Sequence, residues 1–322
     1  QERKLRIFKA AEIFIEEKME IFENPKCILI IKLGALGDVM MAEGVMRCIR
    51  QHYPKAHITL ITEPLYARFM NKAPHFDEVL AFKRVPRWHF ASQRAVKTRL
   101  KSANYDLVID LQNSSHSRRF QSWLQNAFIS STSKYADIRY HRDASRNLAS
   151  REYLREQVET IGVDMSAGYF SNLTWAAEDV SHVLAQHKIK NTFALLVAGS
   201  AARHPQKRWP GFPALVEELA ARNIQAVTAP GPDEHDLCAS LPAIMLMDGD
   251  KFLTLGQLVG LASHCGFVVG NDTGPTHMLA AANTKGVALF GTNHSPAANT
   301  GIGEIYQVLE KPSMMDISVQ EV

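Results

Sequence analysis

Apolar residues are grouped along the chain in two alternating patterns. Short apolar runs, typical of buried strands, alternate with stretches in which apolar residues recur every three or four positions, as in amphipathic helices. The predicted strands occupy residues 27–33, 57–62, 78–82 and 105–111, and then residues 193–198, 224–229, 244–247, 267–270 and 287–290. Strands that alternate with helices predict an α/β fold with parallel sheets covered by helices.

The two series of strands are separated by a polar, helix-bearing stretch at residues 162–191. We therefore predict two Rossmann-like domains that face a central cleft, which agrees with the length of 322 residues. The predicted domains span residues 26–165 and 166–304, and a C-terminal tail spans residues 305–322. Ligands of open α/β sheets bind beyond the carboxyl ends of the strands, so the site is expected in the turns that follow strands.

An extra amphipathic helix is predicted before the first strand, in the segment 1–25. Its apolar residues are spaced by three and four positions and form one stripe. These residues are Leu5, Phe8, Ala11, Ile15, Met19 and Phe22. Two roles stay open for this helix: packing on the domain or on a second subunit, and contact with a membrane surface.

Composition argues against several classes of protein. Lys and Arg total 36 against 33 Asp and Glu, so the chain lacks the basic excess of most nucleic-acid-binding proteins. No apolar run is long enough to span a bilayer, and no signal-peptide pattern begins the chain, so a cytoplasmic location is predicted. The four cysteines lack a CxxC spacing and predict reduced thiols, and no spacing of His, Cys or carboxylates indicates a metal site.

The first candidate motif is KLGALGD at residues 32–38, between the first strand and a helix. Gly34 and Gly37 allow a tight turn, which is expected to present free N–H groups on which an anion or a sugar could rest. The spacing matches neither the GxGxxG dinucleotide motif nor a Walker A loop. Asp38 has two interpretations that stay open, an N-cap of the helix and a functional carboxylate.

The second candidate motif is GSAARHPQKRWP at residues 199–210, again directly after a strand. It gathers three cations, Arg203, Lys207 and Arg208, ahead of a helix. Such a loop could clamp the diphosphate of a leaving group. A solvated basic loop is the alternative.

The third candidate motif is VVGNDTGPTHMLAA at residues 268–281, where a buried strand leads through a polar turn into a helix that Pro275 begins. Free N–H groups at a helix N-terminus, with a histidine one turn in, predict a phosphate site. The residues concerned are Thr273, Gly274, Thr276 and His277. An N-cap by Asp272 or Thr273 is compatible with that site, and Thr292 after the next strand is expected to line the same cleft.

These three motifs, in this order and spacing, resemble glycosyltransferase family 9, the ADP-heptose:lipopolysaccharide heptosyltransferases of Gram-negative bacteria. The resemblance covers about residues 26–300. It implies a GT-B fold and an inverting, metal-independent transfer from ADP-heptose, which is a substrate, so that no cofactor is needed. It also implies a lipid-linked core oligosaccharide as the acceptor, met at the inner face of the inner membrane.

The resemblance also implies roles for individual residues. Asp38 matches the general base, and Lys207 matches a lysine on the donor phosphates. Asp272 matches an aspartate near the donor sugar, while Thr273, Gly274 and His277 match the diphosphate-binding turn. Glu234 matches an acidic residue that holds the adenosine ribose. The other residues predicted to bind the donor are Ser200 and Thr292.

Acceptor recognition is predicted for the first domain. The sequence DLQNSSHSRR at residues 110–119 follows the fourth strand, and Arg118 could meet anionic groups of the acceptor. A solvated surface arginine is the alternative. The predicted acceptor-binding residues are Lys32, Gly37, Asn113 and Arg118.

The chain departs from the family pattern in two places. Residues 33–36 lack the Ser or Thr that the family often has there, and the N-terminal helix is not part of the usual pattern. Three alternatives stay open: a GT-B-like transferase for another nucleotide sugar, a sugar-nucleotide epimerase, and a non-catalytic relative. A shared fold does not fix a substrate.

Overall fold

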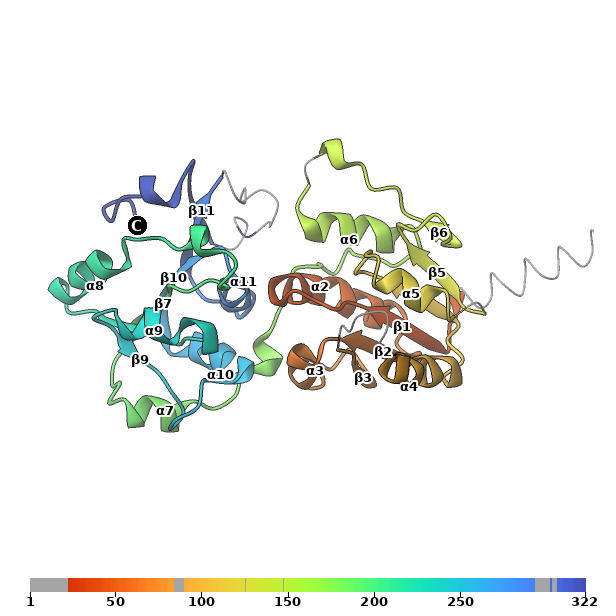
Figure 1. The fold of residues 1–322 in the computed structure, drawn as a ribbon, viewed down its shortest axis with the longest axis horizontal. Coiled ribbons are helices and arrows are strands. Elements are labelled where there is room, and N and C mark those ends of the chain that lie inside the picture. The colour runs from red at the N-terminus through yellow and green to blue at the C-terminus, as the bar shows by residue number, and fades with distance from the viewer. Residues whose placement is uncertain (1–22, 84–89, 125, 147, 293–301, 303–305) are drawn as a thin grey trace, which may run out of the picture. The chain divides into compact units, whose positions relative to one another are not determined.

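The computed structural model describes residues 23–83, 90–124, 126–146, 148–292, 302 and 306–322. The described chain forms two compact units, each built on one sheet (Figure 1). The first unit includes the described residues up to 34, residues 45–143 and residues 154–169, and the second unit includes the rest. The predicted N-terminal helix falls mostly outside the described residues, and the predicted domain boundaries stay predictions.

The first unit contains a sheet of six parallel strands in the order β3-β2-β1-β4-β5-β6. The strands are β1 (Cys27–Ile31), β2 (His57–Thr62), β3 (Glu78–Ala81), β4 (Leu107–Asp110), β5 (Phe128–Ser131) and β6 (Ile138–Arg139). The α-helices that follow these strands in the chain are α2 (Leu36–His52), α3 (Pro64–Met70), α4 (Phe90–Ser102), α5 (Ser117–Gln121) and α6 (Ser150–Glu159). Residues 36–44 of α2 and 150–153 of α6 belong to the second unit.

The second unit contains a sheet of six parallel strands in the order β12-β11-β10-β7-β8-β9. The strands are β7 (Phe193–Val197), β8 (Gln225–Thr228), β9 (Ile244–Met245), β10 (Cys265–Asn271), β11 (Gly286–Gly291) and β12 (Gln307–Lys311). The α-helices are α7 (Ser181–Gln186), α8 (Phe212–Ala221), α9 (His235–Ala239), α10 (Leu255–Gly260) and α11 (Gly274–Ala281).

The two sheets have the same topology. Counted from the first strand of each unit, both follow the order 3-2-1-4-5-6, which is the strand order of the Rossmann fold. The order reverses between β1 and β4 in the first unit and between β7 and β10 in the second. Ligands bind outside the carboxyl ends of the strands at such reversals, so a ligand site is expected in the turns after these four strands.

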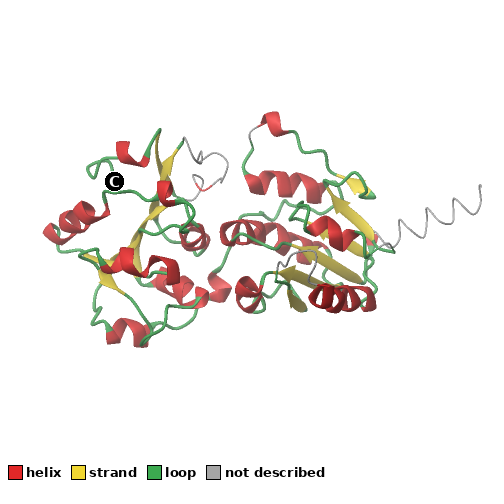
Figure 2. Cartoon of the chain, viewed as in Figure 1, coloured by secondary structure: helices red, strands yellow, loops and turns green. Residues whose placement is uncertain are grey.

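Apolar side chains on both faces of the sheet explain why the first unit is parallel and covered by helices. All of β1 from Ile28 to Ile31 is buried. Leu29 and Ile31 join a core cluster with Leu100 of α4 and Phe120 of α5. Figure 2 shows the strands of each unit with helices beside them. Strands buried on both faces read as continuous apolar runs, which is why the sequence pattern located them.

The core of the second unit includes the end of the second motif. Leu196 of β7 and Val269 of β10 cluster with Trp209 and with Phe212 of α8. The indole N–H of Trp209 donates to the carbonyl of Ile317 at 2.9 Å, so the buried ring also satisfies its polar atom. The loop at residues 199–210 is therefore anchored in the core at its far end.

The nine predicted strands are all present, with ends within two residues of the prediction. Three strands were not predicted: β5, β6 and β12, the last of which lies inside the predicted C-terminal tail. β5 ends in two serines, β6 has two residues, and β12 is a half-buried edge strand. None of them has an apolar run, because edge positions and short strands need little apolar surface.

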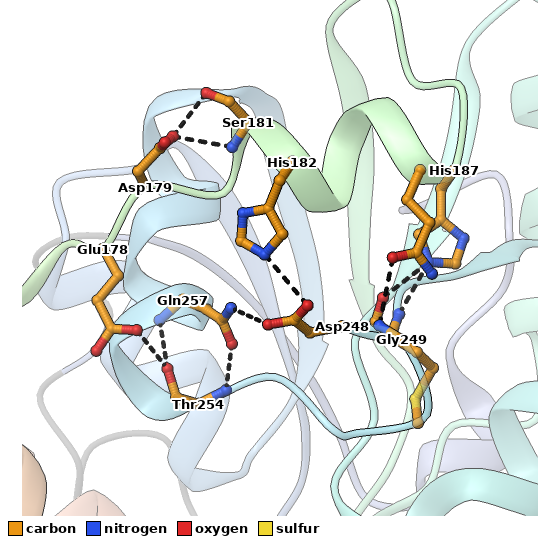
Figure 3. Close-up of polar contacts among 11 residues, drawn as sticks. Glu178, Asp179, Ser181, His182, His187, Asp248, Gly249, Thr254 and Gln257 are labelled. Carbon is orange, nitrogen blue, oxygen red and sulfur yellow. Dashed lines mark hydrogen bonds and ion pairs between the residues drawn. The ribbon is translucent and has the colours of Figure 1, made fainter.

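Polar side chains from three segments of the second unit meet at the start of α10 (Figure 3). Thr254 is the N-cap, since its hydroxyl accepts from the N–H of Gln257 at 3.0 Å, and Gln257 accepts in return from the N–H of Thr254 at 2.8 Å. The amide of Gln257 also donates to Asp248 at 2.8 Å, and Asp248 pairs with His182 of α7 at 3.2 Å. The network fixes the first turn of α10 and ties α7 to it.

Candidate active site

Three N–H groups of the turn between β1 and α2 donate to side chains of the chain itself. The side-chain oxygen of Gln112 accepts from the N–H of Leu33 at 2.8 Å and from that of Gly34 at 3.2 Å. The next N–H, of Ala35, donates to the carboxylate of Asp38 at 3.0 Å. These three N–H groups are therefore not free, because two side chains of the chain itself already accept from them. The N–H groups of Leu36 and Gly37 have no acceptor among the described residues, so binding of an anion or a sugar at this turn stays a prediction.

Asp38 lies in the first turn of α2 and is partly exposed. It is not the N-cap residue, but its Oδ2 accepts from the N–H of Ala35, the residue just before the helix. A carboxylate in the first turn is favoured because it satisfies an unpaired N–H and interacts well with the helix dipole. Oδ1 makes no hydrogen bond to any residue that the structure describes, so capping leaves one oxygen to accept a proton.

The residues predicted to bind the acceptor differ in how they are engaged. The ammonium of Lys32, which is 7% exposed, donates to the carbonyl of Leu111 at 3.1 Å. The amide of Asn113 donates to Gln157 at 2.7 Å and accepts from the N–H of Thr132 at 2.8 Å. Both side chains therefore hold the fold together. Gly37 lies in the first turn of α2, and Arg118 is exposed on α5.

In the second unit a carboxylate is held between an ammonium group and an imidazole. Asp272, which follows β10, is 8% exposed. One of its oxygens pairs with the ammonium of Lys207 from the turn after β7, and the other lies 3.1 Å from Nε2 of His277 in α11. Lys207 also donates to the carbonyl of Asp272 at 3.4 Å. Three predicted site residues thus form one cluster at the reversal between β7 and β10, although Lys207 and Asp272 are 65 positions apart in the chain.

The ionisation of Asp272 should make stability depend on pH. Burial raises the pKa of Asp272, but hydrogen bonds from His277 and Lys207 and their positive charges outweigh burial and lower this pKa to about 2. A carboxyl whose pKa is lower in the folded state stabilises the folded protein when the pH is above its unfolded-state pKa of 3.8. This contribution disappears as the pH falls toward 2. It should amount to about 2 kcal/mol at neutral pH.

We therefore expect the gap in unfolding free energy between the wild-type protein and Asp272→Asn to shrink by about 1 kcal/mol between pH 6 and pH 3. Urea unfolding at the two pH values measures it. Asp250→Asn, at an exposed position, is the control and should show no such change. A gap that stays constant for Asp272→Asn would contradict the proposed charge pairing.

The N-terminus of α11 presents unpaired N–H groups. Thr273 occupies the N-cap position, but its side chain makes no capping hydrogen bond. Within the described residues, no acceptor is found for the N–H of Thr273, Gly274 or Thr276. The hydroxyl of Thr276 is used elsewhere, since it donates to the carbonyl of Asn271 at 2.6 Å. The N-cap alternative is therefore not realised, and these amides are available to an anion.

Asn271 is a site residue that the sequence motif contained but sequence reasoning did not single out. Its side chain is fully buried. Its amide nitrogen donates to the carbonyls of Ala198 at 2.8 Å and Gly199 at 3.2 Å, and its oxygen accepts from the N–H of Trp209 at 3.1 Å. Asn271 thereby ties the end of β10 to both ends of the loop that carries Lys207. An asparagine at the end of a buried strand was the available signal.

Ser200 also organises this loop. Its hydroxyl donates to the carbonyl of His204 at 2.9 Å and accepts from the guanidinium of Arg208 at 3.1 Å. A second guanidinium nitrogen of Arg208 donates to the carbonyl of Ser200 at 3.1 Å. The predicted donor-binding Ser200 is thus a buried structural residue in its observed contacts, and Arg208 is turned toward the loop's own backbone.

Glu234 lies beside the turn that follows β7. Its carboxylate accepts from the N–H of Gly231 at 3.0 Å. A Cβ at Gly199 would stand only 2.1 Å from Oε1 of Glu234, so this position requires glycine for the carboxylate to approach the backbone. Thr292, after β11, donates its N–H to the carbonyl of Lys311 at 2.8 Å and continues the pairing with β12.

Two further properties follow from the described part of the chain. No helix in it is long and apolar enough to cross a membrane. No group of three or more His, Cys, Asp or Glu side chains among the described residues is arranged to hold a metal ion.

The family model of glycosyltransferase family 9 (heptosyltransferase) matches residues 93–311 of the chain. The protein belongs to glycosyltransferase family 9. Membership makes it a glycosyltransferase, which disfavours the epimerase and the non-catalytic relative. The matched range includes the second and third motifs and the whole Lys207, Asp272 and His277 cluster.

Relatives of this family 9 enzyme agree with that membership. Lipopolysaccharide heptosyltransferase 2 of Escherichia coli K12 is 24% identical over 297 residues, which is 82% of this chain and 82% of that protein. The crystal structure of the glycosyl transferase family 9 from Veillonella parvula superimposes with a TM-score of 0.78 at 19% identity, over 90% of this chain and 87% of the other. The structure of the E. coli heptosyltransferase WaaC with ADP gives a TM-score of 0.70 at 18% identity, over 91% and 97%. The predicted GT-B fold with two Rossmann-like sheets is confirmed.

Proposed function

We propose that this family 9 glycosyltransferase moves heptose from ADP-heptose to a hydroxyl of a lipid-linked lipopolysaccharide core, with inversion at the anomeric carbon and without a metal. The observation that carries the proposal is a set of N–H groups at the start of α11 that have no acceptor among the described residues, next to the cluster of Lys207, Asp272 and His277. Relatives that are named lipopolysaccharide heptosyltransferases and a related structure with ADP support the choice of donor and acceptor.

The donor diphosphate is proposed to bind at the N-terminus of α11. Helix N-termini attract anions through their free N–H groups and the helix dipole. The ammonium of Lys207 has three N–H donors. Two of them donate to Asp272, one to its carboxylate and one to its carbonyl. The remaining donor can reach a phosphate oxygen. Because the ammonium of Lys207 pairs with the carboxylate of Asp272, the carboxylate does not leave a net negative charge that would repel ADP.

Departure of ADP requires stabilisation of the negative charge that gathers on the diphosphate oxygen. In this proposal the N–H groups of Thr273 and Gly274 and the ammonium of Lys207 supply it. Donors that are already oriented stabilise such charge without reorganisation at the moment of reaction. A metal ion is then not needed for leaving-group departure.

Asp38 is proposed as the general base. An acceptor hydroxyl is a weak nucleophile, so a carboxylate takes its proton as the oxygen bonds to the anomeric carbon and the bond to ADP breaks. A single displacement of this kind inverts the anomeric centre. Oδ1 of Asp38 has no partner among the described residues, whereas Oδ2 is held by the N–H of Ala35. The carboxylate is therefore oriented and has an oxygen for the proton.

Acceptor recognition is proposed for the exposed Arg118, because a guanidinium suits phosphate and carboxylate groups. Lys32 and Asn113 are engaged within the fold and would contribute by shaping the surface. A place in the cytoplasm, at the inner face of the inner membrane, stays a prediction.

Calorimetric titration with ADP, UDP, GDP and CDP tests the donor proposal. We expect ADP to bind most tightly and the Lys207→Met variant to bind ADP about 10- to 100-fold more weakly, because a charged hydrogen bond to phosphate is lost. Lys190→Met, at an exposed position of the same unit, is the matched control and should bind as the wild type does. Equal affinity for all four nucleotides, or an unchanged affinity in Lys207→Met, would contradict the proposal.

A further inference from the structure

The turns that follow β1 and β4 in the first unit are joined by one side chain. Gln112, two residues beyond the end of β4, accepts with its Oε1 from the N–H groups of Leu33 and Gly34, at 2.8 Å and 3.2 Å. The partners are 79 and 78 positions apart in the chain. Because the order of strands reverses between β1 and β4, this bridge stands where α/β proteins place their ligands.

Gln112 is itself held in place by a buried network. The fully buried carboxylate of Asp110 accepts from the N–H groups of Gln112 at 3.0 Å and Asn113 at 2.9 Å, and from the amide of Gln121 at 2.6 Å. The fully buried amide of Gln157 donates to the carbonyl of Asp110 at 3.1 Å and accepts from Asn113 at 2.7 Å. The backbone from which Gln112 extends is therefore fixed on both sides.

The turn that Gln112 holds leads directly to Asp38. Leu33 and Gly34 are buried, and Gly34 has a φ of 153°, a conformation that side-chain-bearing residues rarely adopt. Ala35 follows, and its N–H donates to Asp38 at 3.0 Å. Three consecutive N–H groups are thus satisfied by two side chains, the first two by Gln112 and the third by Asp38.

We propose that Gln112 is a positioning residue for the transfer reaction: it holds the 33–34 turn and, through that turn, the place of the Asp38 carboxylate. The inference rests on the proposed role of Asp38 as general base and adds to it the residue that orients it. An amide oxygen can accept two N–H groups at once, and loss of that oxygen leaves two buried donors unpaired. The turn then moves to reach water or another acceptor, and Asp38 moves with it.

Substitutions at position 112 separate the accepting oxygen from the size of the side chain. Gln112→Met keeps the length and removes the acceptor, whereas Gln112→Glu keeps an accepting oxygen. We expect Gln112→Met to lower kcat by about 10- to 100-fold, since a misplaced catalytic group costs rate steeply, with little change in the affinity for ADP. Gln112→Glu should recover kcat to within a few-fold of the wild type. Gln51→Met, at an exposed position near the end of α2, is the control.

Kinetics with ADP-heptose and a lipopolysaccharide core acceptor, together with calorimetry of ADP, provide the readout. The Gln112→Met substitution is also made in the Asp38→Asn background, where it should cost no further rate because the group that it positions is gone. Circular dichroism melting checks folding, and Gln112→Asn, whose shorter side chain cannot reach both N–H groups, replaces Gln112→Met if that variant does not fold. Gln112→Asn should lower kcat in the same way.

The outcomes distinguish the inference from the proposed function. If Gln112→Met and Gln112→Asn keep the wild-type kcat while Asp38→Asn loses it, the inference about Gln112 is overturned. The proposed role of Asp38 as general base is then retained. If Gln112→Met lowers kcat by the same factor in the Asp38→Asn background, Gln112 does not act through Asp38, and the inference is again overturned. If Asp38→Asn itself keeps the wild-type kcat, the proposed function of Asp38 fails.

Discussion

The Asp38→Asn variant is expected to transfer sugar at least about 10²-fold more slowly than the wild type, with nearly unchanged affinity for ADP. Asparagine keeps an oxygen that can accept from the N–H of Ala35, so the first turn of α2 should be retained. It cannot take the proton of the acceptor hydroxyl. The loss should therefore appear in kcat rather than in nucleotide binding, since the donor site of this proposal is built on α11.

Initial rates with ADP-heptose and a core acceptor, and calorimetric titration with ADP, measure the two quantities. Asp250→Asn, exposed in the second unit, controls for the change of charge and should keep the wild-type rate. Melting by circular dichroism shows whether Asp38→Asn is folded. A folded Asp38→Asn enzyme with wild-type turnover would rule out Asp38 as the base.

The Asn271→Leu variant is expected to lose at least about 3 kcal/mol of unfolding free energy and most of its affinity for ADP. Leucine has a similar size but leaves the carbonyls of Ala198 and Gly199 and the N–H of Trp209 without their partner. Each buried polar group that loses its hydrogen bond costs about 1–3 kcal/mol. The loop at residues 199–210 should also shift, and Lys207 with it.

Chemical unfolding followed by circular dichroism and calorimetry with ADP test this expectation. Asn126→Leu, at an exposed position of the first unit, is the control and should change stability by less than about 0.5 kcal/mol. Asn271→Asp provides a second comparison, because it keeps an acceptor for Trp209 but turns a negative oxygen toward two carbonyls. Wild-type stability and ADP affinity in Asn271→Leu would show that this side chain does not hold the loop.

The predictions for Gln112 and Asn271 rest on the same structural feature. At each reversal of strand order, a side chain from one turn accepts or donates hydrogen bonds to the backbone of the other turn. Gln112 joins the turns after β4 and β1, and Asn271 joins the turns after β10 and β7. Because parallel neighbouring strands end at the same edge, their turns meet there although they are distant in sequence. The side chains for which a function is proposed lie close to these turns in the chain: Asp38 in the first turn of α2 and Lys207 in the loop after β7.

The sequence alone determined the elements whose signal is local. Continuous apolar runs located β1 and β10 because parallel strands are buried on both faces, and Pro275 marked the start of α11. The motif at residues 268–281 predicted an N-terminus with free N–H groups, and α11 has them among the described residues. Such features depend on a few neighbouring residues and can therefore be predicted without a structure.

The tertiary structure decided which polar groups are already satisfied, because their partners come from distant turns. From the sequence, the N–H groups of Leu33 and Gly34 were expected to be free for an anion. Both donate instead to the side chain of Gln112, which is 79 positions away from Leu33. Lys207 and Asp272, 65 positions apart, became one charge-paired cluster only when β7 and β10 paired. The strands β5, β6 and β12 likewise form because a neighbouring strand offers hydrogen bonds, since their own residues carry too little apolar surface to specify a strand.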